Sequence, residues 1–169
     1  MIDFSSAPPG QNREHTLIQD AAPGDEAAVQ QLVFSVLREY GLTPDAGGAD
    51  ADLKDLQAFY VNRGGTFRIV TDEEGNIVGC GGLLPAGAGD IELRKMYLLP
   101  QARGKGIGRR LLEDLIATAR AQGHARMVLD TASSLKEAIG LYRSRGFRPY
   151  ENPDRVRRCD QSFFLYLAT

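Results

Sequence analysis

Apolar residues recur every three or four positions in several segments of the chain, and this spacing predicts amphipathic helices. Two helices are predicted over residues 25–40 and 53–60, and two more over residues 106–122 and 135–145. Asp25 stands where the first of them would take its N-cap. A glycine follows each segment within four residues, as is common where a helix ends. The chain is therefore expected to contain about four helices.

Shorter segments rich in β-branched and aromatic residues, bounded by turn residues, predict β-strands. Residues 66–71 and 77–84 flank a turn at residues 72–76, which predicts a β-hairpin. Further strands are predicted at residues 16–18, 91–99, 127–129, 147–150 and 162–167. A strand–helix–strand–helix stretch follows the early hairpin and favours parallel pairing with a right-handed crossover. The expected fold is α/β, with a mixed sheet flanked by helices.

Composition and charge narrow the class of protein. The chain has 169 residues, 43% of them hydrophobic, which is typical of one soluble domain. Residues 1–13 hold few residues that could be buried and are interpreted as a flexible leader before a single domain over residues 14–169. A net charge of -2 does not favour a nucleic-acid partner.

No segment has the layout of a secretory signal or the apolar length that crosses a bilayer, so a cytoplasmic location without a membrane partner is expected. Cys80 and Cys159 are too few for a disulfide framework. Together with the two histidines they form no metal-ligand spacing, so no metal is expected. Neither cysteine has a neighbouring base that would indicate a nucleophile.

The most informative segment is a glycine-rich turn at residues 100–110, between a predicted strand and a predicted helix. Gly104, Gly106 and Gly108 would let a ligand approach the main chain, and the first amides of the helix favour an anion. The spacing fits neither a Walker loop nor a dinucleotide fingerprint, because glycines that those motifs require are missing. A phosphorylated ligand is the preferred interpretation, and a tight turn among solvated basic residues is the alternative.

The turn also resembles a known family. Arg103-Gly104-Lys105-Gly106-Ile107-Gly108, preceded by Gln101, is similar to the acetyl-coenzyme A pyrophosphate loop of the GCN5-related N-acetyltransferases, or GNAT family. Leu141-Tyr142-x-x-x-Gly146-Phe147 resembles a later signature of that family, and similarity in layout extends over about residues 16–150. The resemblance implies the GNAT fold, in which the central sheet is splayed. It also implies transfer of an acetyl group from acetyl-coenzyme A to an amine.

The resemblance further implies which residues hold the acetyl donor. In this family the pantetheine arm pairs with the main chain of the splayed strand, and this role passes here to Met96 and Leu98. The Leu98 amide would also polarise the thioester carbonyl, whereas an ordinary interior strand is compatible with the same side chains. The residues expected to contact acetyl-coenzyme A are Met96, Tyr97, Leu98, Gln101, Arg103, Gly104, Lys105, Gly106, Ile107, Gly108, Arg109, Ser133 and Tyr142.

Two catalytic side chains follow from the same resemblance. Tyr142 is expected to protonate the departing thiolate, although its helical spacing by itself favours core packing. Glu92 is expected to act as the general base for the acceptor amine, with a surface ion pair to Arg94 or Lys95 as the alternative.

The chain departs from the family pattern where many relatives carry an asparagine that contacts the donor. Leu135 stands at that position. Ser133 or Ser134 is expected to replace the contact.

The acceptor is expected to be a primary amine of a small molecule or peptide. Its walls are expected from the first two helices, with Asp45, Asp50 and Asp52, and from the loop after Pro153. An arginine at position 155, 157 or 158 would hold a substrate carboxylate, with solvated loop charges as the favoured alternative. A homodimer is compatible with the sequence.

The interpretation that follows is direct attack of the amine on acetyl-coenzyme A in a ternary complex, without a covalent enzyme intermediate. A domain that binds acyl-coenzyme A as a sensor or partner-binding module, without catalysis, is the main alternative. Nucleotide binding is a third.

Overall fold

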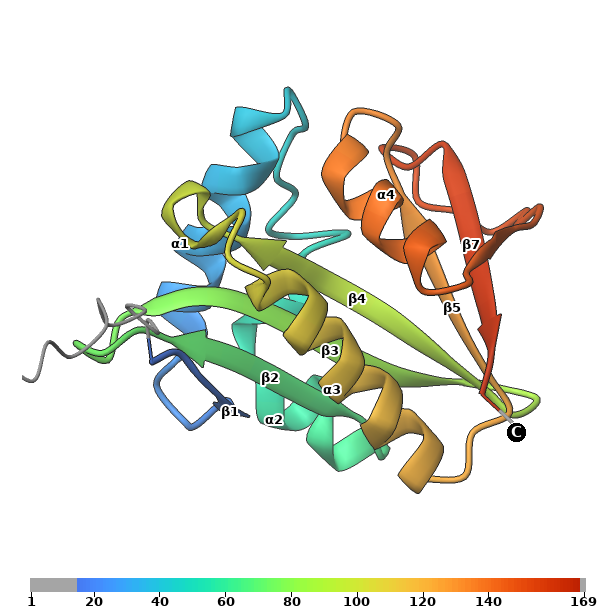
Figure 1. The fold of residues 1–169 in the computed structure, drawn as a ribbon, viewed down its shortest axis with the longest axis horizontal. Coiled ribbons are helices and arrows are strands. Elements are labelled where there is room, and N and C mark those ends of the chain that lie inside the picture. Colours follow the sequence, from blue (N-terminus) through green and yellow to red (C-terminus); the bar gives the residue numbers. More distant parts are fainter. Residues whose placement is uncertain (1–14, 168–169) are drawn as a thin grey trace, which may run out of the picture.

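The computed structural model describes residues 15–167, and the expected leader at residues 1–13 lies outside this range. A seven-stranded sheet with the order β1-β2-β3-β4-β5-β7-β6 forms the centre of the molecule (Figure 1). The strands are β1 (Leu17–Asp20), β2 (Thr66–Thr71), β3 (Ile77–Gly87), β4 (Asp90–Leu98), β5 (Arg126–Thr131), β6 (Arg148–Pro149) and β7 (Gln161–Tyr166). All neighbours are antiparallel except β4 and β5, which run parallel. The expected mixed sheet is confirmed.

The parallel pair opens along its length. β4 and β5 are paired only from Asp90–Glu92 on one strand to Arg126–Val128 on the other. Beyond these residues the two strands diverge, which Figure 1 shows as a V with its point near the C-terminus. This is the splayed strand pair that the resemblance implied, and it leaves the second half of β4 with one unpaired edge.

The helices are α1 (Glu26–Glu39), α2 (Leu56–Phe59), α3 (Ile107–Ala121) and α4 (Lys136–Ser144), with short 3₁₀ turns at Ala51–Lys54, Val61–Arg63 and Pro100–Ala102. The continuous helix predicted over residues 53–60 is wrong. Asp55 adopts an extended conformation, and its side chain accepts a hydrogen bond from the Ala58 amide, so α2 starts anew there. Asp25 is the N-cap residue of α1, as predicted, but its side chain makes no capping hydrogen bond and accepts from the Ala22 amide instead.

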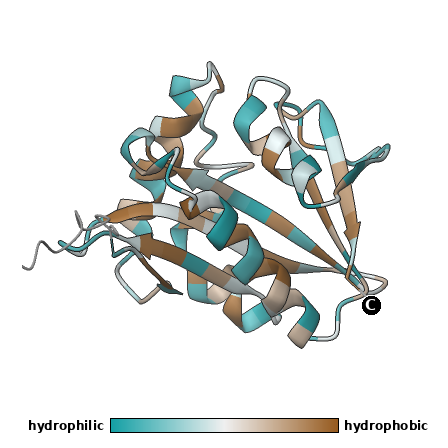
Figure 2. Cartoon of the chain, in the orientation of Figure 1, coloured by the Kyte–Doolittle hydropathy of each residue, from teal (hydrophilic) through white to brown (hydrophobic). Residues whose placement is uncertain are grey.

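Two hydrophobic cores lie on opposite faces of the sheet, because successive residues of a strand point to opposite sides. Ile69 packs with α1 and α2, whereas its neighbour Val70 packs with α3 and α4. Figure 2 shows polar and apolar residues alternating along β4. None of the helices within residues 15–167 is long and apolar enough to span a membrane.

Candidate active site

The glycine-rich turn joins β4 to α3 and leaves the start of that helix open. Gly104 and Gly106 have φ of 74° and 77°, a left-handed conformation that L side chains rarely adopt. Among residues 15–167 no side chain caps the helix, and the amides of its first turn, from Ile107, have no partner within the helix. A Cβ on Gly108 would lie 3.3 Å from Leu98 Cδ1, so this glycine permits close approach of helix and strand. The three glycines thus shape the turn and pack it against β4.

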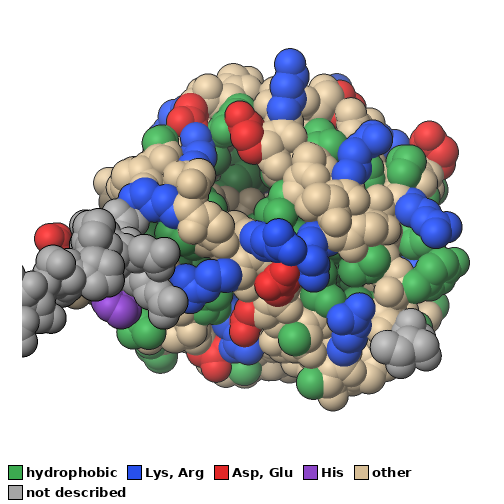
Figure 3. Space-filling model, viewed as in Figure 1, with side chains coloured by type: hydrophobic (Ala, Val, Ile, Leu, Met, Phe, Trp, Pro, Cys, Tyr) green, Lys and Arg blue, Asp and Glu red, His purple; other side chains and the backbone are tan. Residues whose placement is uncertain are grey.

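A cleft of about 320 Å³, here called the turn cleft, opens in front of this turn between α1, the end of β4 and α4. Figure 3 shows a hollow in this view, with hydrophobic side chains in its depth and charged side chains on its rim. Nine of the residues expected to bind the donor line the turn cleft: Met96, Tyr97, Leu98, Arg103, Gly104, Gly106, Gly108, Arg109 and Tyr142. The structure therefore brings most of the predicted set together.

Four of the expected donor-binding residues do not line the turn cleft. Gln101, Lys105 and Ile107 line a separate hollow that includes Thr16. The amide and the hydroxyl of Ser133 both donate to the carboxylate of Asp160, at 2.8 and 2.7 Å. The side chain of Ser133 is therefore engaged elsewhere, and the position of the missing asparagine is filled in the cleft by Leu135.

Arg103 holds the end of β4. Its Nε and Nη2 atoms donate to the Leu98 carbonyl at 3.1 and 2.9 Å, and its guanidinium pairs with Glu39 at 2.6 Å. It also lies 5.3 Å from the centre of the Tyr40 ring. These contacts occupy the guanidinium that the sequence assigned to the donor, so its charge is largely neutralised by Glu39.

The Leu98 amide faces away from β3. The Leu99 amide donates to the Val78 carbonyl of β3 at 2.9 Å. Because main-chain groups alternate along a strand, the amide and carbonyl of Leu98 face away from β3, and Arg103 meets the carbonyl on that side. The predicted oxyanion donor is therefore directed at the open edge of β4.

A bulge in β4 sets the direction of this edge. The pairing of β3 with β4 shifts between Cys80 and Gly82, and Lys95 has a φ of 54°. Such a conformation is strained in a residue with a side chain and persists only where the surroundings hold it. The Lys95 ammonium is 3.2 Å from Asp50 and 3.3 Å from Asp52, with its side chain only 6% exposed. Buried ion pairs therefore hold the bulge.

Arg158 belongs to the same buried network. Its guanidinium donates to both oxygens of Asp50, at 2.7 and 2.5 Å. Burial raises the pKa of Asp50, but hydrogen bonds from Arg158 and from the Asp45 amide, with the charge of Lys95, lower it to about 2. The predicted arginine that holds a substrate carboxylate is thus engaged by a carboxylate of the protein. Arg155 pairs with Glu151 instead.

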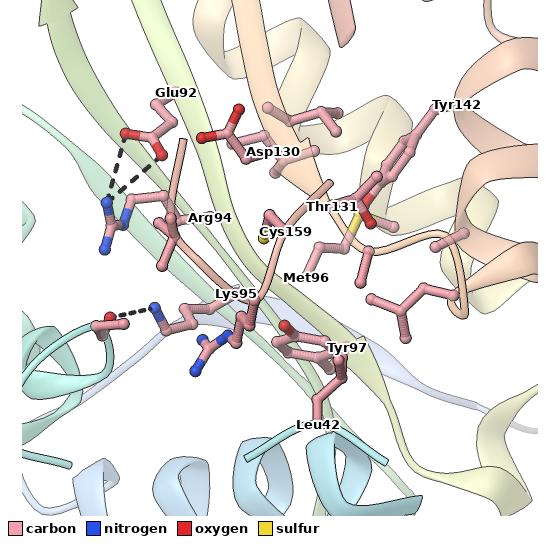
Figure 4. A pocket seen from close by; sticks show the side chains of 18 residues that line it. Leu42, Glu92, Arg94, Lys95, Met96, Tyr97, Asp130, Thr131, Tyr142 and Cys159 are labelled. Atoms are coloured by element: carbon pink, nitrogen blue, oxygen red, sulfur yellow. Dashed lines mark hydrogen bonds and ion pairs between the residues drawn. The ribbon is translucent and has the colours of Figure 1, made fainter. Parts of the chain in front are cut away.

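Tyr142 lies at the junction of the turn cleft with a second, smaller hollow. This second hollow of about 90 Å³, here called the inner hollow, lies between β4, β5 and the loop before β7 (Figure 4). Burial raises the pKa of the Tyr142 phenol, so it stays protonated at neutral pH. Among the described residues nothing hydrogen-bonds its hydroxyl. The residues shared by both hollows are Met96, Tyr97, Leu135, Ala138 and Tyr142.

Glu92 lines the inner hollow on the side away from Tyr142 (Figure 4). Its carboxylate oxygens lie 3.4 and 3.5 Å from Arg94 Nη1. The ion pair considered as an alternative is therefore present, and a role as base stays a prediction.

Sequence reasoning missed several walls of the turn cleft, which are Val36, Tyr40, Glu137, Ala138 and Leu141. Tyr40 and Glu137 come from α1 and α4, and their side chains approach to 3.4 Å. Apolar periodicity identified both helices, but it carried no signal that their ends meet across the cleft. In the inner hollow, Leu42 and Ala49 come from the segment after α1, whereas Asp45, Asp50 and Asp52, which the sequence predicted for the acceptor wall, do not line it.

Comparison with known proteins agrees with this geometry. The acetyltransferase (GNAT) family matches residues 33–147. The chain is 41% identical to the uncharacterized N-acetyltransferase YjgM of Escherichia coli over 73% of its length and 76% of that protein. The chain belongs to the GNAT family. Its enzymes are acyltransferases, and the architecture fits that activity.

Solved structures of GNAT proteins have the same fold. A GNAT-family acetyltransferase from Staphylococcus aureus superposes with a TM-score of 0.86, at 23% identity, over 91% of this chain and all of that one. The acetyltransferase yncA of Salmonella typhimurium, solved with its cofactor acetyl-CoA, superposes with a TM-score of 0.71 at 24% identity, over 90% of this chain and 94% of that one. These likenesses place the splayed sheet of this GNAT protein within the fold of the family.

Proposed function

We propose that residues 14–169 form one N-acetyltransferase domain that moves an acetyl group from acetyl-coenzyme A to a primary amine. The observation that carries the proposal is the junction of the two hollows at Tyr142. One hollow begins at a helix start suited to phosphates, and the other opens between β4 and β5. A donor and an acceptor entering from the two sides would meet at that junction. The solved relative that contains acetyl-CoA supports this choice of donor.

The residues of the turn cleft fit acetyl-coenzyme A. The amides at the start of α3, from Ile107, would hold the diphosphate, and Arg109 at the rim, which pairs with Glu113 at 3.2 Å, would add a positive charge. The pantetheine arm would lie along the open edge of β4, where the Leu98 amide is directed. The Leu98 carbonyl is occupied by Arg103, so pairing would use the amide there and other main-chain groups of β4.

The acetyl group would then lie beside Tyr142. The amine nitrogen attacks the thioester carbon, negative charge gathers on the carbonyl oxygen, and the Leu98 amide stabilises it. As the carbon–sulfur bond breaks, the Tyr142 hydroxyl gives its proton to the thiolate. The proton lost by the amine passes to water in the inner hollow, and Glu92, at the end of this hollow away from Tyr142, is our candidate for its final acceptor. No enzyme-bound acyl intermediate is needed.

The experiment is an acceptor screen that spans polyamines, amino acids, aminoglycosides and peptide N-termini, with release of free thiol from acetyl-coenzyme A as the readout. We expect release that depends on one class of amine. Thermal stabilisation by acetyl-coenzyme A without thiol release in any arm would show a binding module instead. Stabilisation by ATP or NAD but not by coenzyme A would show a nucleotide-binding domain.

A further inference from the structure

Five charged side chains line the inner hollow, and they differ in whether a counter-ion holds them. Three are cations: Arg94, Lys95 and Arg158. Two are carboxylates: Glu92 and Asp130. The net charge of these side chains decides which charge on an acceptor is favoured, because a partly buried charge without a counter-ion strongly attracts a group of opposite charge.

The three cations are all neutralised by the protein itself. Arg158 and Lys95 both reach Asp50, with shortest distances of 2.5 and 3.2 Å. Lys95 also pairs with Asp52, and Arg94 is 3.7 Å from the same carboxylate. The two aspartates are 0% and 1% exposed, so they belong to the wall rather than to the open space.

Arg94 also forms an ion pair with Glu92, which supplies the third carboxylate for the three cations. The closest contact between their charged groups is 3.4 Å. Arg94, Lys95 and Arg158 therefore face three carboxylates, namely Asp50, Asp52 and Glu92. The network is neutral, and it leaves no cation free to receive an anionic substrate group.

Asp130 is the charged residue of the lining that stands outside this network. Its oxygens accept from Asn152 Nδ2, at 3.1 and 3.2 Å, and from the Ser162 hydroxyl at 2.6 Å. Both donors are neutral, and within residues 15–167 no ion pair reaches Asp130. Neutral donors orient a carboxylate without cancelling its charge. The inner hollow therefore carries one uncompensated negative charge at a fixed position.

Asp130 lies away from Tyr142 in the inner hollow, where it could contact the far end of an acceptor. Figure 4 shows Asp130 beside Glu92 on one side and Tyr142 on the other, with Cys159 and Thr131 between them. Apolar residues, among them Leu129, also line the inner hollow. An acceptor whose reacting amine lies at Tyr142 would place a second group near Asp130.

We propose that Asp130 binds a second cationic group of the acceptor, so that the acceptor is a diamine or polyamine rather than an amino acid. The inference rests on the proposed function, because it takes the inner hollow as the acceptor site. The contact is an ion pair between the Asp130 carboxylate and an ammonium, with methylene groups along the apolar wall between that ammonium and the reacting nitrogen.

The first experiment compares amines that differ only in their far end. Linear α,ω-diamines with three to six methylene groups are each matched with the amino alcohol and the amino acid of the same length. At the best length we expect kcat/KM to be highest for the diamine and lowest for the amino acid, about fivefold or more apart at each step. In Asp130→Asn the ratio of diamine to amino alcohol should fall at least fivefold.

Asp154→Asn is the matched control, because this exposed carboxylate of the neighbouring loop lines neither hollow. It should keep the wild-type ratio. An unchanged ratio in Asp130→Asn, or a preference for the amino acid in the wild type, would overturn the inference and leave Asp130 as an acceptor that merely ties Asn152 and Ser162 to β5.

The second experiment measures the charge without any turnover. Cys159 lines the inner hollow, whereas Cys80 is fully buried, so Cys159 is a reporter within the site. Methanethiosulfonate reagents with a trimethylammonium or a sulfonate end are compared for their rates at this thiol. We expect the cationic reagent to react faster, and the ratio of rates to fall several-fold in Asp130→Asn but not in Asp154→Asn.

The two experiments separate the inference from the proposed function. If no amine releases thiol, the function is wrong, and the labelling ratio still decides whether Asp130 makes the hollow selective for cations. Equal labelling rates, or no labelling of Cys159 by either reagent, would contradict the inference whatever the outcome of the acetyl-transfer assay.

Discussion

The two hollows that meet at Tyr142 are built in different ways. The turn cleft takes most of its lining from one continuous segment, residues 96–109, and it offers main-chain amides and apolar side chains. The inner hollow takes its lining from β4, β5, α4 and two distant loops, and five of its residues are charged. A site made of main chain needs only a local turn, whereas a site made of paired charges needs several segments in register.

This difference explains why the two halves of the site carry different information. Gly104 and Gly106 are required by the backbone conformation of the turn, so their spacing is visible in the sequence. The Asp50–Arg158 pair joins residues more than one hundred positions apart, and no local sequence pattern predicts it. The turn proposed to hold the donor is therefore visible in the sequence, whereas the charges proposed to select the acceptor are visible only in the fold.

The largest effect is expected at the junction itself. In Tyr142→Phe, kcat should fall about 100-fold or more, because the proton for the leaving thiolate is lost. The dissociation constant for acetyl-coenzyme A should change less than about twofold, since the ring still packs 5.6 Å from Phe147. Thiol release and calorimetric titration measure the two quantities. Tyr150→Phe, outside both hollows, is the control, and an unchanged kcat in Tyr142→Phe would remove the residue from the mechanism.

The next largest effect is expected in the pH dependence of the free energy of unfolding, which tests the ion pairs beside the inner hollow. The pKa of Asp50 is about 2 in the folded protein, against 3.8 as its ordinary value. Its charge therefore contributes stability that is fully present above about pH 4 and is lost as the pH falls toward 2, with a limit of about 2 kcal/mol. Urea unfolding should show that Asp50→Asn destabilises strongly at pH 6, and that the difference from wild type shrinks by about half at pH 3. A difference that stays constant with pH would contradict this account.

The turn cleft can be tested with two glycines at opposite ends of α3. Gly106 and Gly123 have φ of 77° and 81°, and neither has an atom within 4 Å of a built Cβ. Gly106→Ala and Gly123→Ala should each lose about 1 kcal/mol of unfolding free energy from backbone strain. Only Gly106→Ala should weaken acetyl-coenzyme A binding, by about tenfold, as measured by titration calorimetry. Equal affinities in the two variants would show that the turn does not hold the donor.

The smallest effect is expected in the rates at which the two cysteine thiols are modified, because one lines the inner hollow and the other lies in the core. Burial raises the pKa of Cys80 to about 12, and its side chain is fully enclosed under α1. Cys159 lines the inner hollow. An aromatic disulfide reagent should therefore modify one thiol in the native protein and two after denaturation. Modification of both thiols at equal rates in the native state would mean that the α1 side of the sheet opens readily.

Much of the fold was predictable because each part of it has a local cause. The hairpin of β2 and β3 follows from a turn between two apolar runs, and α1, α3 and α4 follow from their apolar stripes. The helix predicted over residues 53–60 failed for a local reason that periodicity does not detect, the cap formed by Asp55. Asp25 is the N-cap residue that the sequence predicted, but its carboxylate binds the Ala22 amide rather than an amide of the helix.

In the site, the residues to which the sequence assigned main-chain roles lie together in the turn cleft. Met96, Leu98 and the glycines lie where the motif implied. The side-chain roles assigned to Arg103 and Ser133 compete with partners in the structure, namely Glu39 and Asp160. Charged side chains take whichever partner folding brings within reach, and a motif does not specify that partner.

The sequence by itself predicted the mixed sheet and the turn at the start of α3, because periodicity and glycine spacing act over short stretches of chain. Its motifs also indicated the family and, through that resemblance, a role for Tyr142. Only the tertiary structure decided that Arg158 holds Asp50, that Lys95 is buried in a strained bulge, and that Asp130 faces the inner hollow without a counter-ion among residues 15–167. Charge pairing depends on distances between segments that are far apart in the chain, and those distances are set only when the chain has folded.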